Sequence, residues 1–291
     1  MSKKLSFEDK IFYTISYAII AFVICITLYP FVFILSSSLS ETGALSRGEV
    51  WLLPKGINFS AYKKVLQDDQ IWTAYSNTIW YVVVGTIVNI IMTTITAYPL
   101  SRKKFSSRNI VMMMIAFTMF FSGGLVPSYL LIRNIGLIDS RWALVIPAAI
   151  STWNLIIMRT FFEGIPESLH EAATIDGCSE FKIMVKIFLP LSLPVLAVMV
   201  LFYAVAHWNS YFSALMYLND QDKFPLQILL RKILIQYDQQ KIVQTVDPRM
   251  DVVGQSVRYA VIIVSTVPIL LIYPFLQKYF MKGVMVGAIK G

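Results

Sequence analysis

The first candidates for chemistry are His170 and Glu171, which are adjacent in a polar stretch. A histidine followed by a glutamate opens the zinc motif H-E-x-x-H, in which two histidines one helical turn apart bind the metal. Position 174, where the second histidine belongs, is a threonine, and the whole chain has only two histidines. We therefore expect no metal centre in this protein.

No other set of residues indicates catalysis. The sequence lacks a recognisable nucleophile–base constellation, and it lacks the G-x-x-x-x-G-K-[ST] loop that holds the phosphates of ATP. Cys25 lies in an apolar run and Cys178 in a polar loop, so we expect no disulfide. We predict a protein that is not an enzyme and binds no cofactor. If it moves a solute actively, a separate subunit must bind ATP and magnesium.

A second group of polar residues lies inside a long apolar run: His207, Trp208, Asn209 and Tyr211. Polar side chains at membrane depth face other helices or a wet cavity. An amide both donates and accepts hydrogen bonds, and Trp and Tyr offer flat apolar faces with one polar tip, which suits a sugar. Two interpretations of the aromatic side chains stay open: they line a solute path, or they form an aromatic belt at the membrane surface.

Two further features of the apolar runs concern such a path. Gly123 and Gly124 stand just before Pro127 and predict a broken helix. Broken helices at membrane depth often mark a substrate path, but small residues also allow helices to pack closely, and both readings stay open. Asn154, in the next apolar run, is another candidate for a path-lining residue.

The elements that position these residues are membrane-spanning helices. Of the 291 residues, 57% are hydrophobic and only 14% are charged, whereas soluble domains carry about 25% charged residues. The sequence predicts an all-α membrane protein, with one transmembrane domain over residues 1–291 and its core at about 75–280. Six apolar runs are long enough to span a bilayer: Ile11–Ser36, Thr78–Leu100, Ile110–Ile132, Trp142–Met158, Ile187–Leu218 and Tyr259–Gln277.

The charged residues indicate the orientation and exclude one function. The net charge of +8 comes from short clusters between the apolar runs, such as Arg102, Lys103, Lys104 and Arg108. Such clusters beside helix ends are typical of the cytoplasmic side, so we expect both termini in the cytoplasm. We expect no nucleic-acid binding, because no basic groove with interleaved aromatic residues is present.

The longest polar stretch that we place on the cytoplasmic side is residues 163–186, EGIPESLHEAATIDGCSEFKIMVK. Apolar and small residues at Leu169, Ala172 and Ala173 predict a short helix, which Gly177 ends. The paired alanines give a surface that another protein can approach closely. A helix lying on lipid is the alternative, but its acidic residues would be repelled by an anionic leaflet.

This stretch resembles the EAA loop of binding-protein-dependent ABC importer permeases, through Glu171-Ala172-Ala173, Gly177 and Ile187-Phe188-Leu189-Pro190. Similarity to the carbohydrate branch of that family extends to residues 121–130, to residues 207–212 and to the C-terminal tail. The resemblance implies the MetI-like fold of ABC importer permeases, with six transmembrane helices like the maltose-type second permease subunit. It also implies that Glu171, Ala172, Ala173 and Gly177 dock onto an ATPase.

From this resemblance we expect a permease subunit of an ATP-driven importer in the bacterial cell membrane, with an oligosaccharide as substrate. The implied partners are a homologous second permease, two ATPase subunits that bind ATP and magnesium, and an extracytoplasmic solute-binding protein. The tail residues Gly287–Gly291 either reach the ATPase interface or form a frayed end.

Two alternatives differ in cargo or in energy source. An importer of peptides, phosphate esters or polyamines would want fixed counter-charges along its path, and the apolar runs offer mostly amides, hydroxyls and aromatic rings. A stand-alone secondary carrier would need groups that hold a coupling ion at membrane depth. His207 is the only Asp, Glu, Lys, Arg or His in the six runs, which argues against such a carrier.

Overall fold

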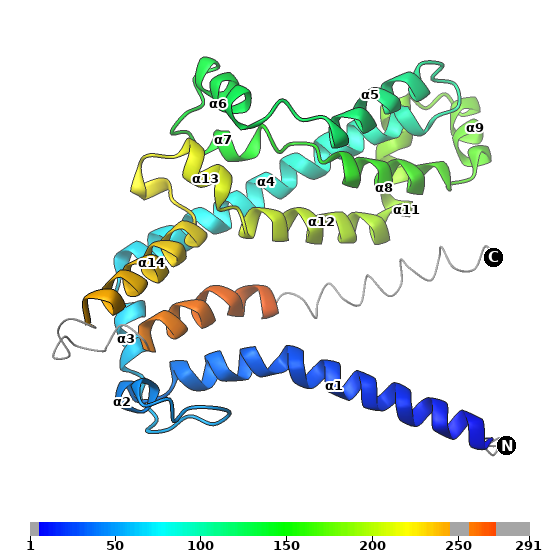
Figure 1. The fold of residues 1–291 in the computed structure, drawn as a ribbon. Coiled ribbons are helices and arrows are strands. Elements are labelled where there is room, and N and C mark those ends of the chain that lie inside the picture. Colours follow the sequence, from blue (N-terminus) through cyan, green and yellow to red (C-terminus); the bar gives the residue numbers. More distant parts are fainter. Residues whose placement is uncertain (1–5, 245–255, 272–291) are drawn as a thin grey trace. The chain divides into compact units, whose positions relative to one another are not determined.

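The computed structural model describes the backbone of residues 6–244 and 256–271, and the side chains of these residues except 236–244. The described residues are largely helical and contain no β-strand (Figure 1). The longer helices are α1 (Phe7–Ser38), α4 (Asp69–Ser101), α5 (Arg108–Phe120), α6 (Leu125–Asn134), α8 (Thr152–Glu163), α12 (Leu193–Trp208), α14 (Leu226–Gln244) and the helix Ser256–Leu271. The shorter ones are α2 (Thr42–Ser46), α3 (Ser60–Leu66), α7 (Trp142–Val145), α9 (Glu167–Ile175), α10 (Glu180–Ile183), η1 (Met184–Phe188), α11 (Leu189–Leu191), α13 (Phe212–Tyr217) and η2 (Gln221–Lys223).

The chain divides into two compact units, which we describe separately. Unit 1 comprises Met1–Asp69 and Leu230–Thr266, and unit 2 comprises Gln70–Leu229 and Val267–Gly291. The sequence predicts a single membrane domain with its core at 75–280, and that remains a prediction.

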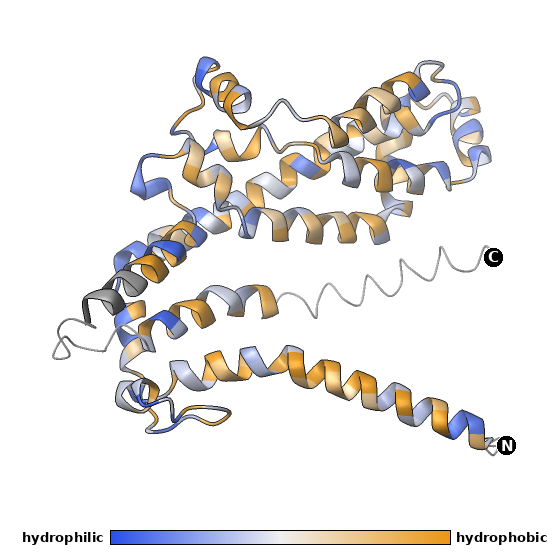
Figure 2. Cartoon of the chain, in the orientation of Figure 1, coloured by the Kyte–Doolittle hydropathy of each residue, from blue (hydrophilic) through white to orange (hydrophobic). Residues whose placement is uncertain are grey.

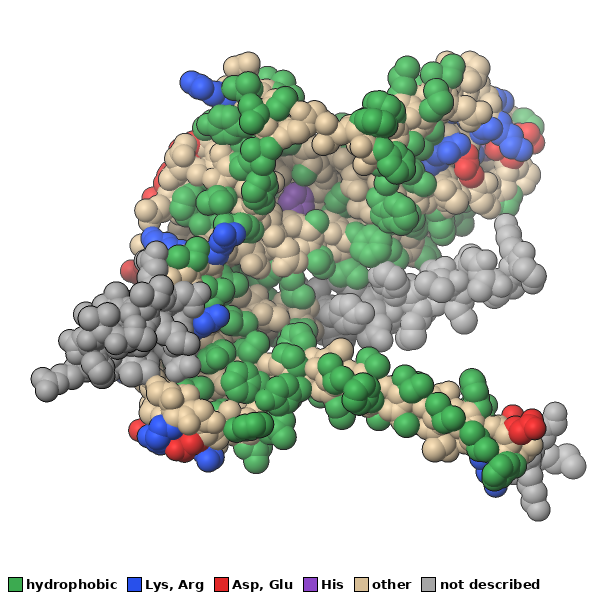
Figure 3. Space-filling view, viewed as in Figure 1, with side chains coloured by type: hydrophobic (Ala, Val, Ile, Leu, Met, Phe, Trp, Pro, Cys, Tyr) green, Lys and Arg blue, Asp and Glu red, His purple; other side chains and the backbone are tan. Residues whose placement is uncertain are grey.

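In unit 1, α1 is a 32-residue helix that is apolar over most of its length (Figure 2). None of its most apolar stretch is buried by other residues that the structure describes. Hydrophobic side chains cover it in the space-filling view (Figure 3). Such a surface is stable in lipid, where it needs no protein partner. At the C-terminal end of α1, the Ser36 hydroxyl donates to the carbonyl of Leu52, 2.6 Å away.

In unit 2, two apolar clusters lie at different levels along α4. One surrounds Tyr81 and includes residues of α7 and α13, and the other surrounds Phe162 and Phe188 and includes the end of α4. α8 packs against α5 and α12, and α13 packs against α6 and α7. Along α4, the polar residues Asn89 and Thr93 lie between the two clusters and are buried.

The predicted spans can be compared with the helices. Among the residues that the structure describes, α1 and α4 are each long and apolar enough to cross a membrane, and up to four such crossings result if two bent helix pairs each count as one. α1 and α4 are longer than predicted, since they begin at Phe7 and Asp69. The predicted sixth span is represented by the helix Ser256–Leu271. Residues 272–277 of that span and the tail Gly287–Gly291 lie outside the described residues.

The predicted break in the third span is confirmed. α5 ends at Phe120 and α6 begins at Leu125, and the two axes are bent by 114°. Gly124 has a φ of +84°, a conformation that glycine adopts without steric penalty.

The fourth span is not the continuous helix Trp142–Met158 that the sequence predicts. α7 has only four residues, the helix stops before Pro147, and α8 then runs from Thr152 to Glu163. Proline has no N–H to continue a helical hydrogen-bond ladder. Ser151 precedes α8 as its N-cap, and its side chain accepts a 3.5 Å hydrogen bond from the Asn154 N–H.

The fifth span is broken as well, between Leu191 and Leu193, where the chain bends by 84°. A π-helical turn, η1, comes just before this bend. Beyond α12, the segment Asn209–Tyr211 separates it from α13. The predicted run Ile187–Leu218, which allowed for interfacial turns, therefore consists of the end of η1 followed by α11, α12 and α13. Pro190 and Pro194 lie in the first turns of α11 and α12, where a missing N–H is tolerated.

Candidate functional site: a polar cavity and a surface helix

His207 of α12 lies between helices and is 5% exposed. Its Nε2 is 2.6 Å from the Oδ1 of Asn89 on α4. One turn before Asn89, Gly85 presents no side chain, and the imidazole occupies the space that a Cβ there would fill. Gly85, Asn89 and His207 are thus fitted to one another. A polar group at this depth needs such partners, because no bulk water is available.

Side chains on the same side of α4 and α12 also form hydrogen bonds with backbone groups in the break of the fourth span. Asn89 Nδ2 donates to the carbonyl of Ala148 at 2.5 Å. The hydroxyl of Tyr203, one turn before His207, accepts from the N–H of Ser151 at 3.2 Å and lies 2.7 Å from the hydroxyl of Thr93. These side chains pair backbone groups that the helix break between α7 and α8 leaves free, which explains how a non-helical segment is tolerated there.

Beside these residues lies a cavity of about 430 Å³. It is lined by polar and aromatic side chains and by the apolar residues Leu144, Ala148, Ile150 and Ala206, and the lining residues contain no Asp, Glu, Lys or Arg. The polar and aromatic lining residues are Asn89, Ser151, Asn154, Tyr203, His207, Asn209, Ser210, Tyr211, Phe212 and Ser213. Four sequence-predicted path residues, Asn154, His207, Asn209 and Tyr211, are therefore brought together around one cavity.

The other three predicted path residues do not line this cavity. Trp208 is 6% exposed, and its ring packs edge-on against Tyr75, with the ring centroids 6.3 Å apart. Gly123 and Gly124 are exposed at the break between α5 and α6. Their assignment to a solute path stays a prediction.

The second functional element is α9, the helix predicted from the EAA pattern. It begins after Pro166 and ends at Ile175, and Gly177 then takes a φ of +74° to turn the chain. Glu171, Ala172 and Gly177 are exposed, and Ile175 is 86% exposed. Ala173 points the other way and is buried in the cluster around Phe162. The outward surface of α9 therefore carries both charged and apolar side chains, and no described residue covers them.

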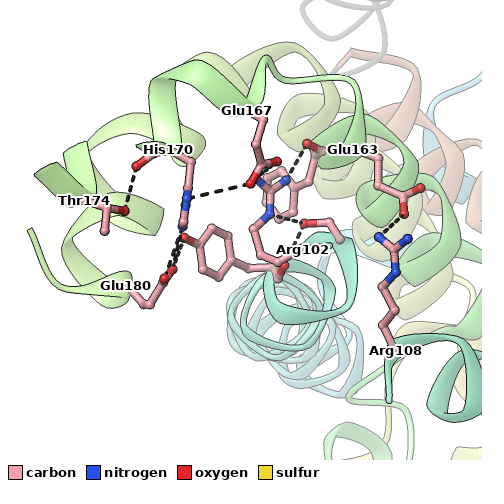
Figure 4. A network of polar contacts seen from close by, with 10 residues as sticks. Arg102, Arg108, Glu163, Glu167, His170, Thr174 and Glu180 are labelled. Carbon is pink, nitrogen blue, oxygen red and sulfur yellow. Dashed lines mark hydrogen bonds and ion pairs between the residues drawn. The ribbon is translucent and has the colours of Figure 1, made fainter. Parts of the chain in front are cut away.

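A polar network connects the inner face of α9 to α4, α8 and α10 (Figure 4). His170 is 1% exposed, and its Nε2 lies 3.0 and 3.1 Å from the two carboxylate oxygens of Glu180 on α10. The hydroxyl of Tyr98 on α4 donates to the same carboxylate at 2.7 Å. Glu180 thus joins three helices through one side chain.

Arg102, which follows α4, forms the second part of the network. It is 6% exposed, and its NH2 donates to the carbonyl of Phe162 near the end of α8 at 2.8 Å. Its NH1 forms an ion pair of 3.5 Å with Glu167 in the first turn of α9. Its guanidinium carbon lies over the Phe188 ring, 4.4 Å from the centroid, a favourable cation–π geometry.

Polar contacts and apolar burial together hold α9. The helix buries only His170 and Ala173, and burying the methyl group of an alanine stabilises by about 0.8 kcal/mol. Hydrogen bonds to charged groups add to this, but they contribute less where the charge is exposed, and the Glu180 side chain is 63% exposed. The position of α9 therefore depends on Ala173 as well as on Glu180, His170 and Arg102. Charged side chains also gather on the surface over this end of the unit (Figure 3).

A third group of polar contacts orders the loop after α13. The backbone N–H groups of Asn219 and Asp220 donate to Asp139 Oδ1 at 3.1 and 3.0 Å, and the Nζ of Lys223 lies 3.3 Å from Oδ2. These N–H donors, helped by Lys223, hold the pKa of Asp139 below its ordinary value. Asn77 of α4 donates to the carbonyl of Asp222 at 2.6 Å.

Sequence reasoning missed most of the residues that position these sites. A signal was present for Gly85, Asn89 and Thr93, which recur every four residues in an apolar run and so share one face of α4. No signal pointed to Tyr98, Arg102 or Glu180, because their partners are distant in the sequence. Arg102 and Phe162 are 60 residues apart, and Tyr98 and Glu180 are 82 residues apart.

Comparisons with known proteins agree with this architecture. The family described as "Binding-protein-dependent transport system inner membrane component" matches residues 71–286. The chain is 39% identical to the polygalacturonan/rhamnogalacturonan transport system permease protein YtcP of Bacillus subtilis (strain 168), over 98% of this chain and 100% of that protein. It is 41% identical to Protein LplC of the same organism, over 91% and 90%.

A solved structure is similar along the whole chain. It is the crystal structure of a bacterial ABC transporter involved in the import of the acidic polysaccharide alginate. One of its chains matches with a TM-score of 0.87 and 36% identity, covering 96% of this chain and 100% of that one. The protein therefore belongs to the family of inner membrane components of binding-protein-dependent transport systems and has the all-α, MetI-like fold of ABC importer permeases.

Proposed function

We propose that this chain is a permease subunit of an ATP-driven importer and forms, with a homologous second permease, the membrane path for an oligosaccharide. The observation that carries this proposal is the cavity lined by Asn154, His207, Asn209 and Tyr211 within a chain of this family. Amides and hydroxyls match the hydroxyl groups of a sugar, and aromatic rings match its apolar face.

For the cargo, we propose an oligosaccharide that contains acidic sugars. YtcP is named for polygalacturonan and rhamnogalacturonan, and the similar solved transporter imports the acidic polysaccharide alginate. The residues that line the cavity of this chain carry neither Lys nor Arg. The carboxylates of such a sugar would therefore be recognised by the solute-binding protein or by the second permease, and this chain would contact hydroxyls and ring faces.

The energy would enter through α9. Two ATPase subunits, which bind ATP and magnesium, would dock on the cytoplasmic side, where we also place both termini. Glu171, Ala172 and Gly177 are exposed and available for docking, whereas Ala173 is buried and would fix the helix from behind. Closure of the ATPase dimer would move α9 and rock the helices between inward-open and outward-open states. An extracytoplasmic solute-binding protein would deliver the sugar.

Reconstitution tests this function directly. The complex purified with its ATPase and second permease is placed in vesicles, and ATP hydrolysis is measured with binding protein loaded with neutral or acidic oligosaccharides. We expect acidic oligosaccharides to stimulate hydrolysis and to accumulate in the vesicles. Stimulation by peptide, phosphate ester or polyamine, or accumulation by this chain alone without ATP, would contradict the proposal.

The docking role of α9 has its own test. Glu171→Arg combined with Gly177→Ala places an opposite charge and a strained residue on the exposed face. We expect the chain to insert normally and to lose its ATPase on co-purification. The matched control is Glu41→Arg with Gly48→Ala, because Gly48 also has a positive φ, +68°, with open space around it. If both double variants retain the ATPase equally, α9 is not the docking element.

A further inference from the structure

We infer that Tyr98, Arg102, Glu167, His170 and Glu180 form a mechanical linkage through which movement of α9 is passed to α4. We call these five residues the coupling linkage. The inference rests on the proposed function, because it assumes that an ATPase moves α9. It assigns positioning roles to side chains that themselves need not contact the ATPase or the sugar.

The first connection of the linkage runs through Glu180. Its carboxylate accepts a hydrogen bond from the hydroxyl of Tyr98 at 2.7 Å, and it lies 3.0 Å from Nε2 of His170 (Figure 4). His170 lies on the inner face of α9 and is almost completely buried. The hydroxyl of Thr174, one turn later on α9, donates to the carbonyl of His170 at 2.8 Å, which is a further hydrogen bond within this helix. A shift of α9 must therefore move His170, Glu180 and Tyr98 together or break a hydrogen bond.

The second connection runs through Arg102, at the end of α4. Its guanidinium contacts Glu167 of α9, the carbonyl of Phe162 at the end of α8, and the ring of Phe188. Tyr98 and Arg102 are one helical turn apart in the sequence. The last turn of α4 thus holds α9 at two points, near the start of α9 through Glu167 and near its middle through His170.

A cavity explains why these polar contacts, and not simple packing, would carry the movement. A space of about 490 Å³ lies beside the linkage, lined by its five residues and by apolar side chains that include Ile95, Pro99 and Phe105 of the α4 region and Phe181 and Met184 of the α10 region. Closely packed surfaces transmit displacement by contact. Where a cavity lies between elements, displacement passes through the side chains that bridge them.

The backbone at both ends of α9 strengthens this argument. The turn Gly164–Pro166 precedes α9, and Gly177 with a φ of +74° follows it. Both ends therefore join α9 to its neighbours through short non-helical turns. Such turns act as hinges, so the chain itself couples α9 only loosely to α8 and α10. The linkage supplies the stiffness that the two turns lack.

The test uses the reconstituted complex and the substitution Tyr98→Phe, which removes only the hydroxyl that contacts Glu180. We expect the amount of oligosaccharide transported per ATP hydrolysed to fall, because movement of α9 is then no longer passed through Glu180 to Tyr98. Binding of the ATPase, measured as its half-saturating concentration, should stay unchanged. The control is Tyr62→Phe, which also removes a 2.7 Å hydrogen bond, in this case to Ser38 in unit 1. It should leave the transport ratio and the ATPase binding unchanged.

A double-mutant cycle separates the linkage from general stability. Glu180→Ala should lower the transport ratio, and Glu180→Gln, which can still accept the Tyr98 hydroxyl, should restore part of it. The combination of Tyr98→Phe and Glu180→Ala should be no worse than Glu180→Ala alone, since the bond is already lost. Additive losses, or a transport ratio in Tyr98→Phe equal to that of Tyr62→Phe, would overturn the linkage. If the unmodified complex itself fails to transport oligosaccharide or to bind its ATPase, the proposed function fails instead.

Discussion

The absence of a side chain at Gly85 determines how His207 is held. The imidazole fills the position of a Cβ at residue 85, and its Nε2 contacts Asn89 one turn further along α4. Asn89 in turn holds the carbonyl of Ala148 in the break between α7 and α8. One backbone position therefore supports the wall of the cavity and the backbone of a neighbouring segment.

We predict that Gly85→Ala destabilises the protein and lowers transport. In a helix interior, replacing glycine by alanine normally stabilises by about 0.5–1 kcal/mol. Here the new methyl group would collide with the imidazole ring. Displacing His207 would leave the buried Asn89 partly unpaired, which costs about 1–3 kcal/mol, so the net effect is a loss. Thermal unfolding of the purified protein in detergent measures the change.

Gly43→Ala serves as the matched control for this prediction. Gly43 is also helical, and a Cβ there would meet only the terminal NH1 of the Arg47 side chain, 3.2 Å away, which can move aside. We expect Gly43→Ala to leave the unfolding temperature unchanged or to raise it slightly. Equal unfolding temperatures for the two variants would show that His207 does not depend on the empty space at residue 85.

At the scale of elements, the carboxylate of Asp139 is one of the groups that hold the loop that follows α13, together with Asn77 and Tyr81 of α4. Asp139 sits at a φ of +58° and accepts two backbone N–H groups of the segment Asn219–Asp220. These donors and Lys223 favour the ionised form, so the pKa of Asp139 is lower in the folded protein than its ordinary value. A group with a lowered folded-state pKa contributes stability at pH values above its ordinary pKa and loses it as the pH falls through the folded-state value.

We therefore predict that Asp139→Asn lowers the unfolding temperature at pH 7 and that the difference shrinks below about pH 4, near the ordinary pKa of an aspartate. Asparagine tolerates positive φ and its Oδ1 still accepts hydrogen bonds, so the substitution mainly removes the charge. Unfolding temperatures of both proteins measured between pH 3 and pH 7 check this. A difference that stays constant across that range would mean that the charge is not the cause.

The elements also show what a sequence can and cannot reveal. The break at Gly123–Gly124 was predicted, because two glycines just before a proline favour a turn, although small residues also allow close helix packing. The break between α7 and α8 was not predicted, although Pro147 lies in it. A proline alone does not predict a break, since Pro30 and Pro99 lie inside continuous helices. Whether a proline breaks a span depends on partners elsewhere, here Asn89 and Tyr203, which satisfy the freed backbone.

The candidate sites divide in the same way. The EAA pattern located α9. The polar residues of the fifth run supplied three of the predicted residues around the cavity, His207, Asn209 and Tyr211, and the fourth run supplied Asn154. The linkage of Tyr98, Arg102 and Glu180 could not be predicted, because contacts between distant segments leave no periodic pattern in one sequence. The burial of Ala173 beside the exposed Ala172 follows from the angle of about 100° between neighbouring residues of a helix, but which of the two faces outward depends on the position of α9.

At the scale of the whole molecule, the exposed apolar surface is as informative as the sites. α1 exposes large apolar side chains on every side, among them Ile19, Ile20 and Phe22, and its acidic residues are confined to the first turn. A helix that is apolar all round is either buried in a core or surrounded by lipid. The described residues leave its most apolar stretch unburied, and lipid is a cover that suits such a surface.

The last prediction tests this with one substitution at two depths. Phe22 lies midway along α1 and is 66% exposed, whereas Phe7 is the first residue of α1 and is 76% exposed. A charged side chain at the centre of a spanning helix costs about 2.5–3.5 kcal/mol, and near the membrane surface it costs little. We expect Phe22→Glu to reduce the fraction of protein that resists alkaline extraction from membranes, and Phe7→Glu, beside Glu8 and Asp9, to leave that fraction unchanged. Equal resistance of the two variants would mean that the middle of α1 is not surrounded by lipid.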